Sequence, residues 1–276
     1  MGEAMSLSKS GIPYLTHTWS PVVGCNRGCD YCWARRLAKR FKCELCRQFL
    51  PHVHNERWRQ VTSTQAPAVV GVGFMAELFQ DESTTVFRDA ASHVPVMRTT
   101  DLVVLLRRKM ILCPQHTYVT PTRCPENIPE GFNPPDNWWL LVTCTTQAEV
   151  DERLPVALER WPSGRVILNL EPLVEPAVPY FSDLGHCAGV ILGGMSGPLA
   201  KDFPLNPDWV RSVRDQCRLT STPFYFKQPA GRPGDWEGGC DEYGTPMLDG
   251  RFELGLPAAW LEILKTQKPQ WQLEQT

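Results

Sequence analysis

Three cysteines near the start of the chain have the spacing of a metal-cluster loop. Cys25, Cys29 and Cys32 form a C-x3-C-x2-C run, and Gly24 and Gly28 let the backbone wrap closely around the sulfurs. Three thiolates from one loop can hold three irons of a 4Fe-4S cluster and leave the fourth iron without a protein ligand. The spacing leaves two alternatives open, a zinc site completed by a distant ligand and three buried free cysteines.

A second group of metal-binding side chains follows this cysteine loop. Cys43 and Cys46 form a C-x2-C pair, and His52 and His54 come within about ten residues of it. Two thiolates and two imidazoles can supply the ligands of a tetrahedral zinc ion. We therefore expect a structural zinc clip, inserted after the first helix. The alternatives are an exposed cysteine pair with two histidines that bind nothing, or histidines that bind a substrate phosphate.

Short β-rich runs alternate with helical patterns along the chain. Most of the runs are continuously apolar with β-branched residues, as in strands covered on both faces of a parallel sheet. The predicted strands are residues 16–19, 68–74, 116–120, 138–144, 166–170, 189–192 and 223–226. This alternation predicts an α/β fold, a partial (β/α) TIM-like barrel of about six or seven parallel strands, with a doubly wound sheet as the alternative. In both folds ligands bind at the carboxyl ends of the strands.

The helices are predicted from periodicity and capping. Trp33, Leu37 and Phe41 recur every four residues and predict an apolar stripe on a basic helix. Asn206 and Pro207 have the residue types of an N-cap and a first helical position. Further helices are expected at residues 101–112, 147–161 and 257–265.

The predicted organisation is one large domain with a tail. Residues 11–228 form the barrel-like domain, with the zinc clip at 43–54, and residues 229–276 form an irregular C-terminal extension with a short helix. The hydrophobic fraction of 42% and the charged fraction of 21% exclude a disordered chain. No stretch approaches the roughly 20 apolar residues of a membrane span, and no signal peptide precedes the domain, so we expect a cytoplasmic protein.

Charge is unevenly distributed. Residues 1–60 contain ten Lys and Arg and four Asp and Glu, a net charge of +6, whereas residues 61–276 have a net charge of −8. A basic segment suits an anionic ligand, and a solvated basic helix face is the alternative. The 11 cysteines are odd in number and partly clustered, which favours metal binding or catalysis over disulfides.

The cysteine loop, with Tyr31 before the third cysteine, resembles the signature of the radical S-adenosylmethionine (SAM) superfamily. A series of motifs from about residue 11 to residue 228 further resembles one phage and bacterial family that is distantly similar to spore photoproduct lyase. The resemblance implies a 4Fe-4S cluster, SAM bound to its open iron, and an electron donor such as flavodoxin or ferredoxin. The motifs are Thr18–Cys25, Ala76–Phe79, Val166–Leu173, Gly193–Pro198, Asp208–Arg211 and Phe224–Gln228.

Several residues at the ends of predicted strands are candidates for contacts beyond the cluster. The resemblance places Glu77 at the SAM amine, and a surface glutamate is the alternative. Glu171 is either a site residue or half of a structural ion pair with a residue such as Lys227. For the others the alternatives are helix capping, a tight turn or core packing. The cofactor-binding candidates are Tyr31, Glu77, Thr145, Asn169, Gly193, Gly194 and Ser196, and the catalytic candidates are Glu171, Lys227 and Cys144.

Two hypotheses of different classes follow. The first is a radical SAM enzyme that abstracts hydrogen from a substrate, with a nucleotide or nucleic acid as the favoured class. The second is a non-catalytic, metal-stabilised binding module whose basic N-terminal residues contact nucleic acid or a partner protein. Its surface would consist of Arg35, Arg36, Lys39 and Arg40 with Tyr31, Trp33 and Trp58. No Walker loop, dinucleotide fingerprint or Gly-x-Ser-x-Gly elbow is present in the sequence, which argues against phosphate-transfer and serine-hydrolase activity.

Overall fold

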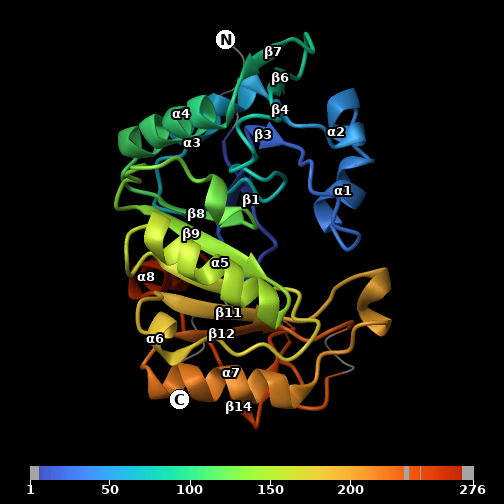
Figure 1. Ribbon diagram of the computed structural model, residues 1–276, viewed down its shortest axis with the longest axis vertical. Coiled ribbons are helices and arrows are strands. Elements are labelled where there is room, and N and C mark those ends of the chain that lie inside the picture. Colours follow the sequence, from blue (N-terminus) through green and yellow to red (C-terminus); the bar gives the residue numbers. More distant parts are fainter. Residues whose placement is uncertain (1–5, 233–235, 243, 269–276) are drawn as a thin grey trace. The chain divides into compact units, whose positions relative to one another are not determined.

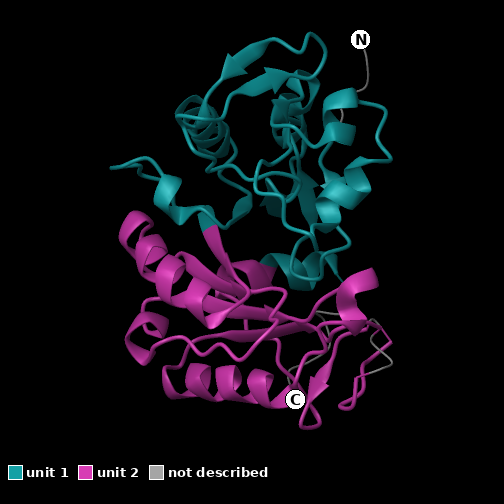
Figure 2. Cartoon of the chain, turned by 45° about the vertical axis from the view of Figure 1, so that its right-hand side comes forward, with its two compact units in different colours: residues 1–139, 263–268 teal, residues 140–262, 269–276 magenta. Residues whose placement is uncertain are grey.

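The computed structural model describes residues 6–232, 236–242 and 244–268. The chain divides into two compact units, shown in Figure 2. The first contains the residues up to Trp139 together with Ile263–Lys268, and the second contains Leu140–Glu262. The boundary between the units falls within residues 11–228, and the predicted division into a domain and a C-terminal extension stays a prediction.

The first unit contains a sheet in the order β1-β2-β5-β8. Strands β2, β5 and β8 are parallel, and β1 pairs with β2 in the antiparallel direction. β5 is apolar and wholly buried, as expected for a strand covered on both faces. The bounds are β1 (Ser8–Lys9), β2 (His17–Trp19), β5 (Val69–Val72) and β8 (Thr117–Thr122).

A second, small sheet in this unit has the order β3-β4-β6-β7. Its strands are β3 (Val22–Val23), β4 (His52–Val53), β6 (Phe87–Asp89) and β7 (Pro95–Met97). None of them was predicted, because strands of two or three residues show no periodicity. The helices of the unit are α1 (Trp33–Ala38), α2 (Glu44–Gln48), η1 (Asn55–Arg59), α3 (Gln60–Ser63), α4 (Thr99–Leu112) and η2 (Pro125–Asn127).

The second unit contains parallel strands in the order β9-β10-β11-β12, and Figure 1 shows α5 and α7 running alongside them. Thr146 caps α5 by accepting a hydrogen bond from the Glu149 amide, and Asn206 caps α7 by accepting one from the Asp208 amide. The strands are β9 (Trp138–Cys144), β10 (Val166–Leu170), β11 (Gly189–Gly193) and β12 (Phe224–Gln228). The helices are α5 (Gln147–Arg160), α6 (Phe181–Leu184), η3 (Pro198–Lys201) and α7 (Pro207–Leu219).

The predicted C-terminal extension is partly regular. β13 (Met247–Leu248) and β14 (Arg251–Phe252) form an antiparallel hairpin, and the Phe226 amide in β12 donates to the Glu253 carbonyl. Trp236 packs edge-on against Phe226, with ring centroids 5.2 Å apart. The predicted short helix is confirmed as α8 (Ala258–Gln267), whose residues from Ile263 belong to the first unit.

The α/β class with mostly parallel strands is confirmed. The seven predicted strands coincide with β2, β5, β8, β9, β10, β11 and β12. In neither unit do the described strands pair so as to close a barrel, so the partial TIM-like barrel stays a prediction. Among the helices of the described residues, none combines the length and apolar character that a membrane crossing needs.

Candidate functional site

The cysteine loop lies at the carboxyl ends of the parallel strands of the first unit. The chain leaves β2, passes through β3 and enters the loop at Gly24, whose amide donates to the Met75 carbonyl at 2.9 Å. The Asn26 amide donates to Oε1 of Gln80 at 3.0 Å. Since Met75 and Gln80 follow β5, these bonds join the loop to the end of the neighbouring strand. Ligand sites of α/β proteins are found at this edge of the sheet.

The three cysteines of the loop are free and half-buried. The Arg27 amide donates to Sγ of Cys25, and the Arg35 amide donates to Sγ of Cys32, each at 3.3 Å. Burial raises the pKa of Cys25 to about 11, opposed by the Arg27 amide, and the nearby charges of Glu77, Cys29 and Cys32 raise it further. A bound metal would reverse this balance, because a coordinating thiol is deprotonated outright.

The surroundings of the Arg35 side chain bear on whether an iron–sulfur cluster fits the loop. Its Nη2 donates to the Cys25 carbonyl at 3.2 Å, and its guanidinium lies 5.3 Å from the centroid of the Phe49 ring. Its Nε is buried and has no hydrogen-bond partner among the described residues. A buried N–H without an acceptor is costly. A sulfide of a cluster whose irons are bound by the three thiolates would be such an acceptor, so the residues present fit this group.

Glu77 and Tyr31, predicted to contact the cofactor, lie on one chain of hydrogen bonds. Oε1 of Glu77 accepts from the Phe79 amide at 3.1 Å and from the Thr122 hydroxyl at 2.8 Å. Oε2 accepts from the Arg123 amide at 2.9 Å, and burial raises the pKa of the carboxyl. The Arg123 guanidinium donates to the Tyr31 hydroxyl. Glu77 is therefore a buried residue with internal partners, and its contact with SAM stays a prediction.

Sequence reasoning missed two residues at the carboxyl end of β8. Besides Arg123, Cys124 lies here, and its Sγ accepts a hydrogen bond from Nη1 of Arg27 at 3.0 Å. Burial raises the pKa of the Cys124 thiol to about 12. Their position directly after a predicted buried strand was the signal that could have identified both.

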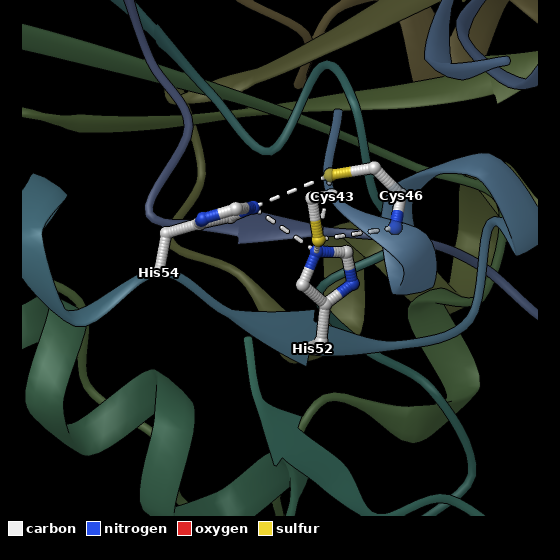
Figure 3. A group of neighbouring side chains, drawn as sticks. All are labelled: Cys43, Cys46, His52 and His54. Carbon is white, nitrogen blue, oxygen red and sulfur yellow. Dashed lines mark hydrogen bonds between the residues drawn. The ribbon is translucent and has the colours of Figure 1, made fainter. Parts of the chain in front are cut away.

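The second predicted group is brought together in the first unit (Figure 3). Cys43 and Cys46 lie at the start of α2, whereas His52 and His54 come from β4 and the residue after it. Their ligand atoms all lie within 4.8 Å of one another. His52 Nε2 is 3.6 Å from Cys43 Sγ and 3.2 Å from Cys46 Sγ, and His54 Nε2 is 3.3 Å from Cys46 Sγ. Zinc–ligand lengths of about 2.0–2.3 Å in a tetrahedron give ligand separations of roughly 3.3–3.8 Å.

Both histidines have a defined tautomer. His52 Nδ1 faces the Leu50 carbonyl at 2.7 Å, and His54 Nδ1 faces a carboxylate oxygen of Glu56 at 3.1 Å. Because both partners are acceptors, each Nδ1 carries the hydrogen and each neutral ring directs an Nε2 lone pair at the sulfurs. Burial lowers the pKa of His52, and it lowers that of His54 to about 4, so both rings are neutral near pH 7. These four residues could hold a metal ion such as zinc.

The second unit brings other predicted residues together at the ends of its strands. Lys227 Nζ and Oε1 of Glu171 form an ion pair. This is the ion pair expected from the sequence as the structural alternative for Glu171. Gly193 lies beside this pair, since a Cβ on it would be 3.4 Å from Cγ of Glu171. A Cβ on Gly194 would be 2.4 Å from the Ala230 nitrogen, so close packing of the chain on itself explains this glycine. The catalytic roles of Glu171 and Lys227 stay predictions.

Asn169 has the least satisfied side chain of the predicted residues in this unit. Its Nδ2 donates to the Thr143 hydroxyl at 3.2 Å, while its Oδ1 is buried and has no partner within the described part of the chain. The Thr145 hydroxyl donates to Oε2 of Glu149, and the residue that caps α5 is the next one, Thr146. Cys144 is fully buried, its thiol donates to the Glu149 carbonyl, and Ser196 is exposed.

The fold and the site together define a mixed α/β protein with mostly parallel strands, a three-cysteine loop at their carboxyl ends and a Cys/His group suited to a metal ion. Residues 9–253 match the model of the family named Protein of unknown function (DUF5131). The match covers most of the chain, which therefore belongs to this family. No significant match was found among curated proteins or among solved structures.

Proposed function

We propose that the protein is a radical SAM enzyme whose cluster is held by Cys25, Cys29 and Cys32. The observation that carries the proposal is the position of these free thiols at the carboxyl ends of parallel strands, beside the buried Nε of Arg35 that has no partner among the described residues. A cluster with one open iron, once reduced by the electron donor, would supply the electron for cleavage of SAM to methionine and a 5′-deoxyadenosyl radical that abstracts hydrogen from a substrate.

The residues around the loop have distinct tasks in this proposal. The Arg27 and Arg35 amides donate to the sulfurs of Cys25 and Cys32, and the bond from Arg27 favours the thiolate form of Cys25. The Arg35 side chain adds a fixed positive charge next to an anionic group. Tyr31 is held by Arg123, whose guanidinium also lies 5.5 Å from the centroid of its ring. These groups would help to hold the cluster and to neutralise part of its charge.

The strand ends of the second unit carry side chains that could bind an organic ligand. Asn169 offers a buried amide oxygen without a partner among the described residues, which suits a hydroxyl or ammonium donor. The Glu171–Lys227 pair offers both charges at the strand ends of this unit, which suits a charged organic ligand. The proposed substrate class is a nucleotide or nucleic acid, and the reducing partner is an electron donor such as flavodoxin or ferredoxin.

A Cys29→Ala variant is expected to lose the cluster, because two thiolates in this loop leave a second iron without a ligand. We expect about four irons per chain and absorbance near 400 nm in wild type purified without oxygen, and neither in the variant. Reduced wild type should release 5′-deoxyadenosine from SAM. A Cys240→Ala variant, which changes a half-buried cysteine of the second unit, is the control and should keep both properties.

Two results would contradict the enzyme proposal. One is zinc without iron in wild type even after reconstitution with iron and sulfide. The other is a reconstituted, reduced cluster that leaves SAM intact. The first result would favour a metal-stabilised binding module.

The surface of α1 supports this second candidate function. Trp33 is 45% exposed and Leu37 is 36% exposed, whereas the helix buries Ala34 and Ala38. Two residues of the predicted apolar stripe, Trp33 and Leu37, therefore face outward beside the exposed Lys39 and Arg40, whereas Phe41 lies beyond the end of the helix and packs against the core. An aromatic ring among basic side chains suits single-stranded nucleic acid. Trp58, predicted for the same surface, is instead buried with its ring edge-on to Trp19.

We expect a Lys39→Glu/Arg40→Glu variant to bind a 20-residue oligothymidine at least about tenfold more weakly than wild type, because two phosphate contacts are replaced by repulsion. Fluorescence anisotropy at several salt concentrations measures both the affinity and the number of phosphate contacts. An Arg108→Glu variant, with an exposed charge reversed on α4, is the control. Equal affinities for all three proteins, or binding that does not depend on salt, would exclude α1 as the nucleic-acid surface.

A further inference from the structure

The segment that carries the Cys/His group also packs against the three-cysteine loop and the strand that leads into it. β4 pairs with β3 in the antiparallel direction, with Val53 opposite Val22 and His52 opposite Val23. The His54 amide donates to the Pro21 carbonyl at 2.7 Å. The strand that leads into the cysteine loop is thus paired with the strand that holds the two histidines.

The contact continues into the loop itself. The Cys25 amide donates to the Phe49 carbonyl at 3.1 Å. A Cβ on Gly24 would lie 2.0 Å from the Leu50 carbonyl oxygen, so the two backbones touch where the loop begins. The same Leu50 carbonyl accepts the Nδ1 hydrogen of His52. One carbonyl group therefore fixes the ring of a candidate metal ligand and packs against the first glycine of the cysteine loop.

Both groups of cysteines also share one small apolar core. Buried in it are Val23, Ala34, Ala38, Cys46, Phe49 and Met75, and Cys25, Cys32, Phe41 and Cys43 pack against them. Helices α1 and α2, which begin at these cysteines, have only six and five residues. Helices this short are not stable without tertiary support. This core is too small to provide much of that support by itself.

The arrangement of the four ligand atoms calls for a cation. Nε2 of His52 and Nε2 of His54 lie 3.0 Å apart. In the tautomers set by Leu50 and Glu56 neither nitrogen carries a hydrogen, so two lone pairs face each other in a buried position. Two sulfurs and two imidazole nitrogens match tetrahedral zinc, and four protein ligands leave no open position for catalysis.

We propose that zinc bound by Cys43, Cys46, His52 and His54 is a structural latch that holds the three-cysteine loop in its folded conformation. Zinc joins α2 to β4, and the short segment between these two elements supplies the carbonyls of Phe49 and Leu50 that contact Cys25 and Gly24. Zinc binds before the cluster assembles, because the loop cannot present its three thiolates together until the segment with Phe49 and Leu50 is in place. The proposed order of assembly rests on the proposed iron–sulfur function, whereas the zinc latch itself does not.

The test uses the full chain, purified without oxygen and without added iron. Zinc content is measured first, and about one zinc per chain is expected. Amide hydrogen exchange is then compared before chelation, after chelation and after zinc is returned. We expect the amides of Gly24 and Cys25 to exchange at least about 100-fold faster after chelation and to recover with zinc, while the amides of β10 in the second unit stay unchanged. Unchanged exchange at Gly24 and Cys25 in zinc-free protein, or protein that binds no zinc, would overturn the latch.

Two variants separate a latch from general unfolding. His54→Cys keeps four ligands and should retain zinc and the protection of Cys25, whereas His54→Ala should lose both. Iron reconstitution is measured on the same samples, with faster and fuller loading expected for the zinc-bound forms. Zinc-dependent protection without any iron loading would leave the latch standing and exclude the cluster. Iron loading that is equal with and without zinc would overturn the proposed order of assembly.

Discussion

A Gly24→Ala variant is expected to lose about 3–5 kcal/mol of the free energy that keeps the first unit folded. Gly24 has a φ of +103°, which side chains rarely adopt, and the added Cβ would lie 2.0 Å from the Leu50 carbonyl oxygen. The obstructing atom belongs to the backbone, so no side chain can rotate to make room. Hydrogen exchange of the amides in β3, β4 and β5 measures the loss.

Gly28→Ala is the matched control in the same loop. Gly28 also has a positive φ, +74°, but a Cβ there would meet nothing within 4 Å. Only the backbone strain remains, and we expect a cost of about 1–2 kcal/mol. If the two variants lost equal stability, the contact between Gly24 and Leu50 would not be what holds the loop in place. The proposal of a zinc latch would then lose one of the observations on which it is based.

A Glu77→Ala variant is expected to destabilise the first unit by at least about 3 kcal/mol. The substitution leaves the Thr122 hydroxyl and the amides of Phe79 and Arg123 without their acceptor in a buried position. Glu77→Gln keeps one acceptor oxygen and should lose only about 1–2 kcal/mol. Hydrogen exchange of β5 and β8 separates the two. A Glu77→Ala variant as stable as wild type would mean that Glu77 is free to serve a ligand.

Glu77 also predicts a pH dependence. Burial raises the pKa of this carboxyl above its ordinary value of 4.5, so the folded state favours the protonated form. The stability that this group contributes is fully present below pH 4.5 and is lost as the pH rises through the pKa of the folded state. Since glutamine does not titrate, the stability of wild type relative to Glu77→Gln should fall with rising pH. Urea unfolding at several pH values tests this, and a constant or rising difference contradicts it.

The main sheet strands were predictable because each is a run of apolar, β-branched residues long enough to identify. The predicted bounds of β9 and β10 are those observed, and α7 begins at Pro207 as its capping residues indicate. The small sheet was not predictable from the sequence. His52–Val53 and Val22–Val23 are too short to show a pattern, and each is a strand only because the other lies beside it.

The helix after the cysteine loop shows the limit of periodicity. Trp33 and Leu37 recur at helical spacing, yet Ala34 and Ala38 face the core. Spacing indicates that side chains share a face, but it cannot say which face is covered when the helix has less than two turns. The face that is covered depends on the core that includes Val23 and Phe49, which come from segments distant in the sequence.

By itself the sequence determined the α/β class, the positions of the long strands along the chain and the four residues of the Cys/His group, because these depend on residue type and local spacing. Even the placement of His52 and His54 on one side follows from extended backbone, in which residues two apart point the same way. Only the tertiary structure decided that the segment carrying the Cys/His group packs against the cysteine loop. It also decided that Glu77 accepts hydrogen bonds from Thr122 and Arg123, and that Lys227 forms an ion pair with Glu171. These contacts depend on pairing between strands and loops far apart in the chain, which no local pattern encodes.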